Sequence, residues 1–147
     1  MADFAKHLKE LKFMYSGVLP SLRTKAIKDR LNNPNCGPNK LILEVSATEG
    51  IARTILIKLL VAKGLKPKNA FKKTSALKIK EVFKNIYELK EKKARSFFNS
   101  KNWKVFVWAI EYRNFLIHHC AYVGGAISNP LIEATTAVRG KIEREWL

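Results

Sequence analysis

The sequence is poor in the residues that make covalent and metal cross-links. It contains two cysteines, Cys36 and Cys120, which lie far apart in a chain of 147 residues. So few cysteines exclude a framework of several disulfides, and neither belongs to a cluster with the spacing of zinc ligands. No group of carboxylates indicates another metal. We therefore expect no metal and no cofactor.

Long apolar runs are also absent. No segment approaches the roughly 20 consecutive apolar residues that a helix needs to cross a bilayer. Charged residues at positions 3, 6, 9 and 10 interrupt the N-terminal segment, where a secretory signal would have a continuous apolar core. These absences predict a soluble protein of the cytoplasm that has no membrane partner.

Acidic residues are scarce as well. The chain has 12 Asp and Glu against 28 Lys and Arg, which gives a formal net charge of +16 and an isoelectric point of about 10.0. A field of this sign attracts polyanions, above all nucleic acid. The alternative interpretation is a lysine-rich protein whose charges only solvate its surface.

What the sequence has instead is helical periodicity. Apolar residues make up 47% of the chain, enough for a core, and the length fits one domain over residues 1–147. The apolar residues recur at helical spacing, and no strand-like alternation of useful length or internal repeat is present. The pattern predicts an all-α, up-and-down bundle of about five to six helices. The expected helices span about residues 3–16, 20–31, 40–63, 74–98, 103–123 and 130–146.

Glycine and proline set several of these boundaries. Gly64 is expected to end the third helix, residues 65–73 to form a basic connector, and Pro130 to lie in the first turn of the last helix. Gly50 lies inside a helix, where it costs about 1 kcal/mol relative to Ala. We expect a closely packed neighbouring helix to compensate for that cost.

The expected helix at 103–123 contains polar residues that are unusual in so apolar a segment. Arg113 and Asn114 are followed by three apolar residues and then by His118. Arg is almost never fully buried unless paired, and burying polar groups carries a cost that the fold must offset. Arg, an amide and His are also what a site needs to bind a phosphate and move a proton. We assign the site to these three residues; the alternative is a purely structural Arg and His bonded within the core.

Helix geometry allows these side chains to meet. Each residue turns the direction by about 100°, so Asn114 and His118, four residues apart, share one face. Arg113 points about 140° away from His118 around the helix. Its long side chain can still curl back toward the imidazole, so that both groups contact one ligand at the edge of the buried face.

This constellation resembles the hallmark of the HEPN superfamily, which is an Arg, a polar residue, three variable residues and a His on a late helix of a small bundle. Arg113, Asn114 and His118 match that pattern in order, spacing and residue type. The layout agrees from about residue 41 to 146, with a long upstream helix, a motif helix, a Gly break and a closing helix. In sequence, the resemblance covers the six-residue motif.

The resemblance implies a specific chemistry. Many HEPN proteins are metal-independent endoribonucleases that act as homodimers, with the motif helices facing each other across the two-fold axis. The ribose 2′-hydroxyl would attack the adjacent phosphate and leave a 2′,3′-cyclic phosphate. His118 would transfer protons, Arg113 would stabilise the transition-state charge, and Asn114 would orient His118 or bind a phosphate oxygen. The implied partners are RNA, a second copy of the chain and an antitoxin protein, in a toxin or antiviral-defence context.

The chain departs from one branch of the superfamily, in which a Tyr follows the His by two residues. Cys120 holds that position here, and the nearest tyrosine is Tyr122, which leaves a regulatory modification of that Tyr in doubt. His119 is an additional histidine whose direction differs from that of His118 by about 100°. We therefore place His119 and Tyr122 around the site rather than in it.

An Arg in apolar surroundings needs an acidic partner. Glu49 is the first candidate for Arg113, with Glu44 and Glu111 behind it. Glu49 also stands four residues before Arg53, which predicts a local ion pair worth about 0.2–0.5 kcal/mol. We favour this local pair over a role for Glu49 beside the catalytic residues.

Basic residues gather around the expected helix at 74–98. The functional interpretation is a track for RNA phosphates with salt-dependent and largely sequence-independent affinity. The alternative is a solvated helix face, and the net charge favours the track. The residues assigned to RNA binding are Lys72, Lys73, Lys92, Lys93 and Arg95, with Lys66, Lys68 and Lys90 nearby.

Three functions therefore compete. The first is an HEPN-type endoribonuclease, which predicts that cleavage requires His118 and Arg113. The second is a non-catalytic HEPN-like module that binds RNA or nucleotides in the same cleft. The third is a basic helical adaptor for acidic protein partners, in which the motif is structural.

Overall fold

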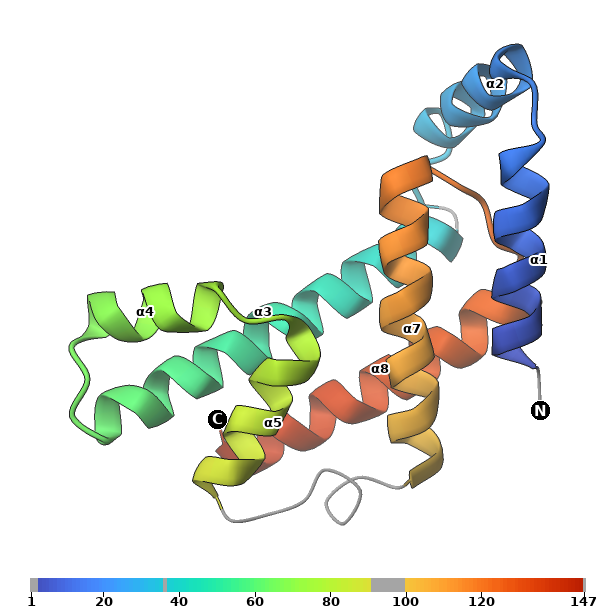
Figure 1. Ribbon diagram of the computed structural model, residues 1–147. Helices are drawn as coiled ribbons and strands as arrows, with labels where there is room; N and C mark the ends of the chain where they lie inside the picture. Colours follow the sequence, from blue (N-terminus) through green and yellow to red (C-terminus); the bar gives the residue numbers. More distant parts are fainter. Residues whose placement is uncertain (1–2, 36, 91–99, 147) are drawn as a thin grey trace.

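The chain is all-α in the computed structural model, which describes residues 3–35, 37–90 and 100–146. These ranges contain no strand, so the expected all-α helical bundle is confirmed. The described helices are α1 (Phe4–Ser16), α2 (Pro20–Leu31), α3 (Gly37–Ala62), α4 (Pro67–Ser75), α5 (Ile79–Leu89), α7 (Ser100–His119) and α8 (Gly125–Trp146), as drawn in Figure 1.

The long helix α3 lies at the centre of the bundle. It packs against α4, α5, α7 and α8, and α8 packs in turn against α7. Figure 1 shows α1 and α7 standing upright at one end, while α4 and α5 lie at the other. The site described below therefore has α3 as its floor and α7 as one wall.

The packing of α3 against α8 follows from two stripes at helical spacing. Residues three or four apart share a helix face, and burying a Leu, Ile or Val side chain is worth about 1.5–3 kcal/mol. Each member of both stripes is at most 1% exposed. The α3 stripe is Leu41, Val45, Thr48, Ala52 and Ile55, and the α8 stripe is Leu131, Thr135, Val138 and Ile142.

Neighbouring helices do not all alternate in direction. α5 runs antiparallel to α7, since Lys80 near its start pairs with Glu111, while Phe83 further along packs on Trp103. α1 and α7 run in the same direction, because Phe4 at the start of α1 contacts Tyr112 and Tyr15 near its end contacts Phe115. The up-and-down order thus holds for some neighbours only.

The expected connector at 65–73 is wrong, because helix α4 covers most of it. Gly64 ends α3 as expected, with a φ of 103° that favours glycine. Pro67 then opens α4, where its missing N–H costs nothing. α4 buries Ala70 and Thr74, so helix formation here depends on docking two small side chains on α3. With this extra helix, the described part of the chain contains seven helices, more than the expected five or six.

The expected helix at 74–98 begins later than predicted. α4 ends at Ser75 and α5 begins at Ile79. Lys78 between them is extended, and its backbone N–H donates to the Glu81 carboxylate at 2.8 Å, which caps the start of α5. The part of the expected helix from residue 91 onward lies outside the described residues.

The junction between α7 and α8 also differs from expectation. α7 ends at His119 instead of Val123, because Cys120 adopts a left-handed φ of 45° and the Ala121 N–H donates to the Leu116 carbonyl. α8 begins at Gly125, so that Pro130 lies inside the helix and not in its first turn. The break between the two helices is therefore shorter than the sequence indicated.

Three further observations concern Gly50, helix α2 and the length of the apolar helices. The expected close approach of a helix to Gly50 is wrong, because a Cβ added there would meet no atom within 4 Å. The side chains that the structure describes on α2 are exposed, and none of them joins the core. Over the described residues, no helix has the length and apolar character required to span a bilayer.

Candidate functional site

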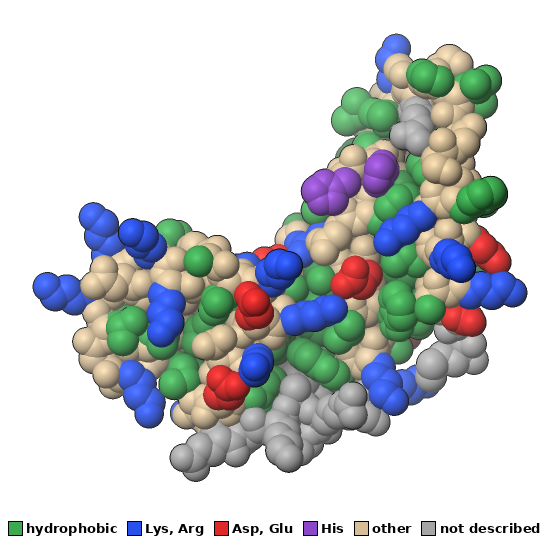
Figure 2. Space-filling model, viewed as in Figure 1, with side chains coloured by type: hydrophobic (Ala, Val, Ile, Leu, Met, Phe, Trp, Pro, Cys, Tyr) green, Lys and Arg blue, Asp and Glu red, His purple; other side chains and the backbone are tan. Residues whose placement is uncertain are grey.

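The three motif residues line one surface pocket. Arg113, Asn114 and His118 project from α7 into a pocket of about 810 Å³. Glu49 and Arg53 of α3 form its floor, and the α4–α5 connection with the start of α5 closes the far side. Figure 2 shows this part of the molecule as a hollow, with histidine side chains on the upright wall and Lys and Arg side chains along the opposite arm. Arg113 thus reaches the pocket despite pointing about 140° from His118 around the helix.

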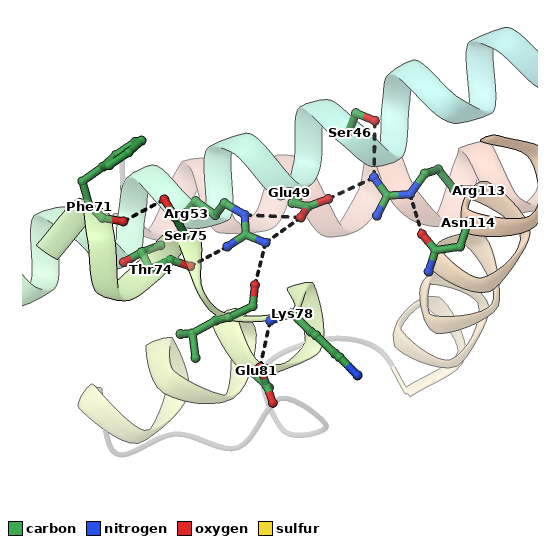
Figure 3. A network of polar contacts seen from close by, with 11 residues as sticks. Ser46, Glu49, Arg53, Phe71, Thr74, Ser75, Lys78, Glu81, Arg113 and Asn114 are labelled. Carbon is green, nitrogen blue, oxygen red and sulfur yellow. Dashed lines mark hydrogen bonds and ion pairs between the residues drawn. The ribbon is translucent and has the colours of Figure 1, made fainter. Parts of the chain in front are cut away.

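Arg113 is anchored to α3. Its Nη1 donates to Glu49 Oε2 at 2.9 Å and to Ser46 Oγ at 3.4 Å, as Figure 3 shows. Its side chain is 11% exposed, so the ion pair is partly shielded from water and is stronger than a surface pair. The guanidinium is therefore held in one position before any ligand arrives.

The remaining donors of Arg113 and Asn114 are available to a ligand. Arg113 Nε donates to Asn114 Oδ1 at 3.0 Å, so the Asn114 oxygen is already used. Within the described residues, Arg113 Nη2 and Asn114 Nδ2 make no hydrogen bond. Two fixed N–H groups that face a pocket are suited to bind the oxygens of a phosphate.

Glu49 joins the two halves of the site. It accepts from Arg113 on α7 and from Arg53 on α3, the latter at 2.7 Å. Arg53 also donates to the carbonyls of Thr74 at 2.6 Å and Leu77 at 2.8 Å. The expected local pair between Glu49 and Arg53 is present, and the same carboxylate holds Arg113. A single acidic residue thus fixes α7 and the α4–α5 connection to α3.

The pKa of Glu49 reflects these contacts. Burial raises the pKa of the carboxyl, but the hydrogen bonds and charges of Arg53 and Arg113 outweigh it and hold the pKa below the ordinary value of 4.5. Glu49 is therefore ionised at neutral pH. A carboxylate that is charged at neutral pH and held between two guanidinium groups serves to position them and is poorly suited to transfer a proton.

His118 and His119 occupy different surroundings. His118 is exposed, lines the pocket and makes no side-chain hydrogen bond within the parts of the chain that the structure describes. His119 packs on Phe115, with ring centroids 4.7 Å apart, and lines a separate, smaller pocket with Tyr15. The two imidazoles therefore line separate pockets.

Of the other residues expected around the site, Tyr122 and Glu44 do not line the pocket, whereas Glu111 does. Tyr122 is exposed, and its backbone N–H donates to Tyr15 Oη. Glu44 pairs with Arg139 of α8, and Glu111 pairs with Lys80 at 3.2 Å. Of the acidic candidates for Arg113, Glu49 is the one that reaches it.

The basic residues divide between described and undescribed parts of the chain. Lys72 and Lys73 are exposed on α4, whereas Lys92, Lys93 and Arg95 lie outside the described residues. Sequence reasoning did not assign the pocket residues Arg53, Lys78 and Lys80 to the site. The spacing of Arg53 from Glu49 predicted their ion pair. Its bonds to the Thr74 and Leu77 carbonyls could not be predicted in this way, because those residues lie 21 and 24 positions further along the chain.

No protein-family model, curated protein or solved structure matches this chain. Among the described residues, no group of three or more His, Cys, Asp and Glu side chains is arranged to hold a metal ion. Inferences about function therefore depend on the geometry of the pocket and on the motif itself.

Proposed function

We propose that this protein is a metal-independent endoribonuclease of HEPN type. The observation that carries the proposal is that Arg113, Asn114 and His118 line one pocket, with Arg113 fixed by Glu49 and two N–H donors left for a ligand. A net charge of +16 supports a polyanionic substrate. The proposed context is a cytoplasmic toxin or antiviral-defence protein that an antitoxin protein restrains.

The proposed reaction is an internal transesterification of RNA. The ribose 2′-oxygen forms a bond to the adjacent phosphorus as the bond from phosphorus to the 5′-oxygen breaks. A base takes the 2′-hydroxyl proton, and an acid gives a proton to the leaving 5′-oxygen. Arg113 Nη2 and the Asn114 amide stabilise the added negative charge on the phosphate oxygens. His118 exchanges protons, because imidazole is the side chain suited to both roles near neutral pH.

One His118 supplies one imidazole, whereas the reaction needs both a base and an acid. A second copy of the chain would provide the other, with two motif helices across a two-fold axis. The exposure of Ile117, whose side chain is 51% accessible beside His118, supports such an interface. Apolar surface at this position would be covered when two α7 helices meet.

The experiment is cleavage of total RNA by the purified protein in excess EDTA, beside His118→Ala matched for folding by circular dichroism. We expect the wild type to cleave and to leave 2′,3′-cyclic phosphate ends, and the variant to lose about 10²–10⁴-fold in rate. Equal cleavage by both proteins would remove His118 from the mechanism. Cleavage that disappears in EDTA would contradict the metal-independent reaction.

The second candidate is an RNA-binding module that does not cleave. It is favoured by the absence, within the described residues, of any hydrogen bond that orients the His118 ring. This function predicts RNA binding that Arg113→Ala weakens, without turnover on any RNA. The third, an adaptor for acidic proteins, predicts that substitutions at Arg113 and His118 change stability and leave RNA binding unaltered.

A further inference from the structure

Helix α4 exposes a large aromatic side chain that the fold does not use. Phe71 is 64% exposed, whereas the face of α4 that packs on α3 consists of Ala70 and Thr74. Phe71 makes no ring contact within the described residues. An aromatic ring that stays mostly in water gains little burial energy from folding, and its exposed surface is available to a ligand.

Two lysines lie on one side of this ring. With about 100° per residue, Lys68 lies about 60° and Lys72 about 100° from Phe71 around the helix, both on the side away from α3. Both lysines are exposed, and the nine residues of α4 include no acidic side chain. Figure 2 shows Lys and Arg side chains over this arm with hydrophobic side chains between them. An aromatic surface beside positive charge fits a strand that carries bases and phosphates.

The arm is tied to the pocket by the polar network of Figure 3. The Thr74 carbonyl of α4 accepts from Arg53, Arg53 pairs with Glu49, and Glu49 pairs with Arg113. The ring of Phe71 points away from α5 in that view. The contacts place α4 at a fixed position relative to Arg113, on the other side of the hollow from α7.

We propose that Phe71 stacks on an unpaired base of single-stranded RNA while Lys68 and Lys72 bind the neighbouring phosphates, and that the strand crosses the hollow to the Arg113–His118 pocket. Cleavage of the strand in the pocket rests on the proposed function. The stacking site itself requires only that the protein binds RNA. An unpaired base is needed because the faces of paired bases in a duplex are covered by their neighbours. The inference thus specifies single-stranded RNA as the substrate class.

The test uses a short 2′-O-methyl RNA labelled with fluorescein, which lacks the free 2′-hydroxyl that the proposed reaction needs, so binding is measured without cleavage. Fluorescence anisotropy compares the single strand with the same strand annealed to its complement. Phe71→Ala should weaken single-strand binding about five- to 150-fold and leave duplex binding nearly unchanged. Phe71→Leu, which keeps apolar bulk but removes the aromatic face, should weaken it nearly as much.

Two matched controls separate stacking from general exposure and charge. Phe13 of α1 is 80% exposed, and Phe13→Ala should leave the dissociation constant unchanged. Replacing Lys68 and Lys72 together by Ala should reduce the slope of log K against log salt by about 1.4. The same double change at Lys6 and Lys9 on α1 should reduce it by less.

Several outcomes would overturn the proposal. Wild-type affinity in Phe71→Ala, or equal losses for single strand and duplex, excludes base stacking. A change of oligomeric state in Phe71→Ala, measured by sedimentation, assigns the ring to a protein interface instead.

The results also distinguish the two proposals. If the wild type cleaves RNA and Phe71→Ala binds RNA as tightly as the wild type, the proposed function is retained and the stacking site is excluded. If binding depends on Phe71 but the wild type cleaves no RNA, the stacking site is retained and the proposed ribonuclease function is excluded.

Discussion

Glu49 Oε2 and Arg113 Nη1 lie 2.9 Å apart although 64 residues separate them in the sequence. The pair connects α3 to α7 and fixes the guanidinium that faces the pocket. Because Glu49 also binds Arg53, which holds the α4–α5 connection, a change at this one carboxylate should affect stability and the site together.

Glu49→Gln is expected to lower the free energy of unfolding by about 1–3 kcal/mol at pH 7. The substitution removes the charge that two partly buried guanidinium groups share, and hydrogen bonds to charged groups are worth this much. Urea denaturation followed by circular dichroism measures the difference. The matched control is Glu88→Gln, whose pair with Lys84 is exposed at 3.8 Å and should contribute less than about 0.5 kcal/mol.

The Glu49 effect should depend on pH in a defined direction. The pKa of Glu49 is lower in the folded protein than its ordinary value of 4.5, so its contribution is present above pH 4.5 and is lost as the pH falls through the folded pKa. The difference between wild type and Glu49→Gln should therefore shrink below pH 4.5. A difference that stays constant down to pH 2 would contradict the charge-based account.

His119→Ala should retain cleavage within a few-fold of wild type, in contrast to His118→Ala. His119 packs on Phe115 in a separate pocket, so its loss removes a ring contact worth about 0.5–1.5 kcal/mol of stability. RNA cleavage rates and urea denaturation of the two variants measure both quantities. Loss of cleavage in His119→Ala, with the fold intact, would transfer the catalytic role from His118.

Ile117→Glu should separate the proposed homodimer. The side chain is 51% exposed at the end of the motif helix, so a charge there costs the monomer little but would be desolvated in an interface between two α7 helices. Sedimentation equilibrium should give a dimer for the wild type and a monomer for the variant. The control is Val61→Glu near the end of α3, where the residue is 37% exposed; this variant should stay dimeric. A monomeric wild type would refute the dimer.

Tyr112→Phe should lower the free energy of unfolding by about 1–3 kcal/mol at neutral pH, since it leaves buried partners unpaired. Its hydroxyl donates to the Phe4 carbonyl at 3.1 Å and lies 2.7 Å from His7 Nδ1. These bonds join α1 to the motif helix. Urea denaturation measures the change, and Tyr122→Phe on the exposed surface is the control that should have no effect.

Alkaline pH should weaken the fold through the same residue. Burial, and to a lesser extent the charge of Asp3, raise the pKa of Tyr112 to about 12 from an ordinary value of 10. A raised folded pKa means that its contribution is complete below pH 10 and is lost as the pH rises from 10 through 12. Tyr112→Phe should therefore lose less stability between pH 10 and 12 than the wild type does. Burial also raises the pKa of Tyr87, so the loss of stability due to Tyr87 remains in the variant. An unchanged pH dependence in Tyr112→Phe would exclude this explanation.

Gly50→Ala should stabilise the protein by about 1 kcal/mol, because Ala is the better helix former. An added Cβ would meet no atom within 4 Å, so no clash opposes the gain. For a chain of this length the midpoint of thermal denaturation should rise by about 2–4 °C. A lower midpoint would mean that the open side of α3 at Gly50 is covered in solution, for example by a second copy.

The class of fold was predictable because helical periodicity is a local property of the sequence. The stripes of α3 and α8 can be read from spacings of three and four residues, and those helices were expected. α4 was missed because its nine residues contain few apolar positions, and its helix depends on docking Ala70 and Thr74 against α3. The start of α8 was missed because Pro130 indicated a first turn, whereas the N–H groups of Ile127 and Ser128 already bond to the Gly124 carbonyl.

The sequence by itself determined the helical class, the positive charge and the three motif residues, since each depends on composition or on spacing within one helix. The tertiary structure decided which acidic residue holds Arg113, which of two adjacent histidines faces the pocket, and that α4 stands across the hollow from α7. Those relationships join residues from different helices. They depend on how α3, α4 and α7 pack, and packing is settled by the burial of many side chains at once.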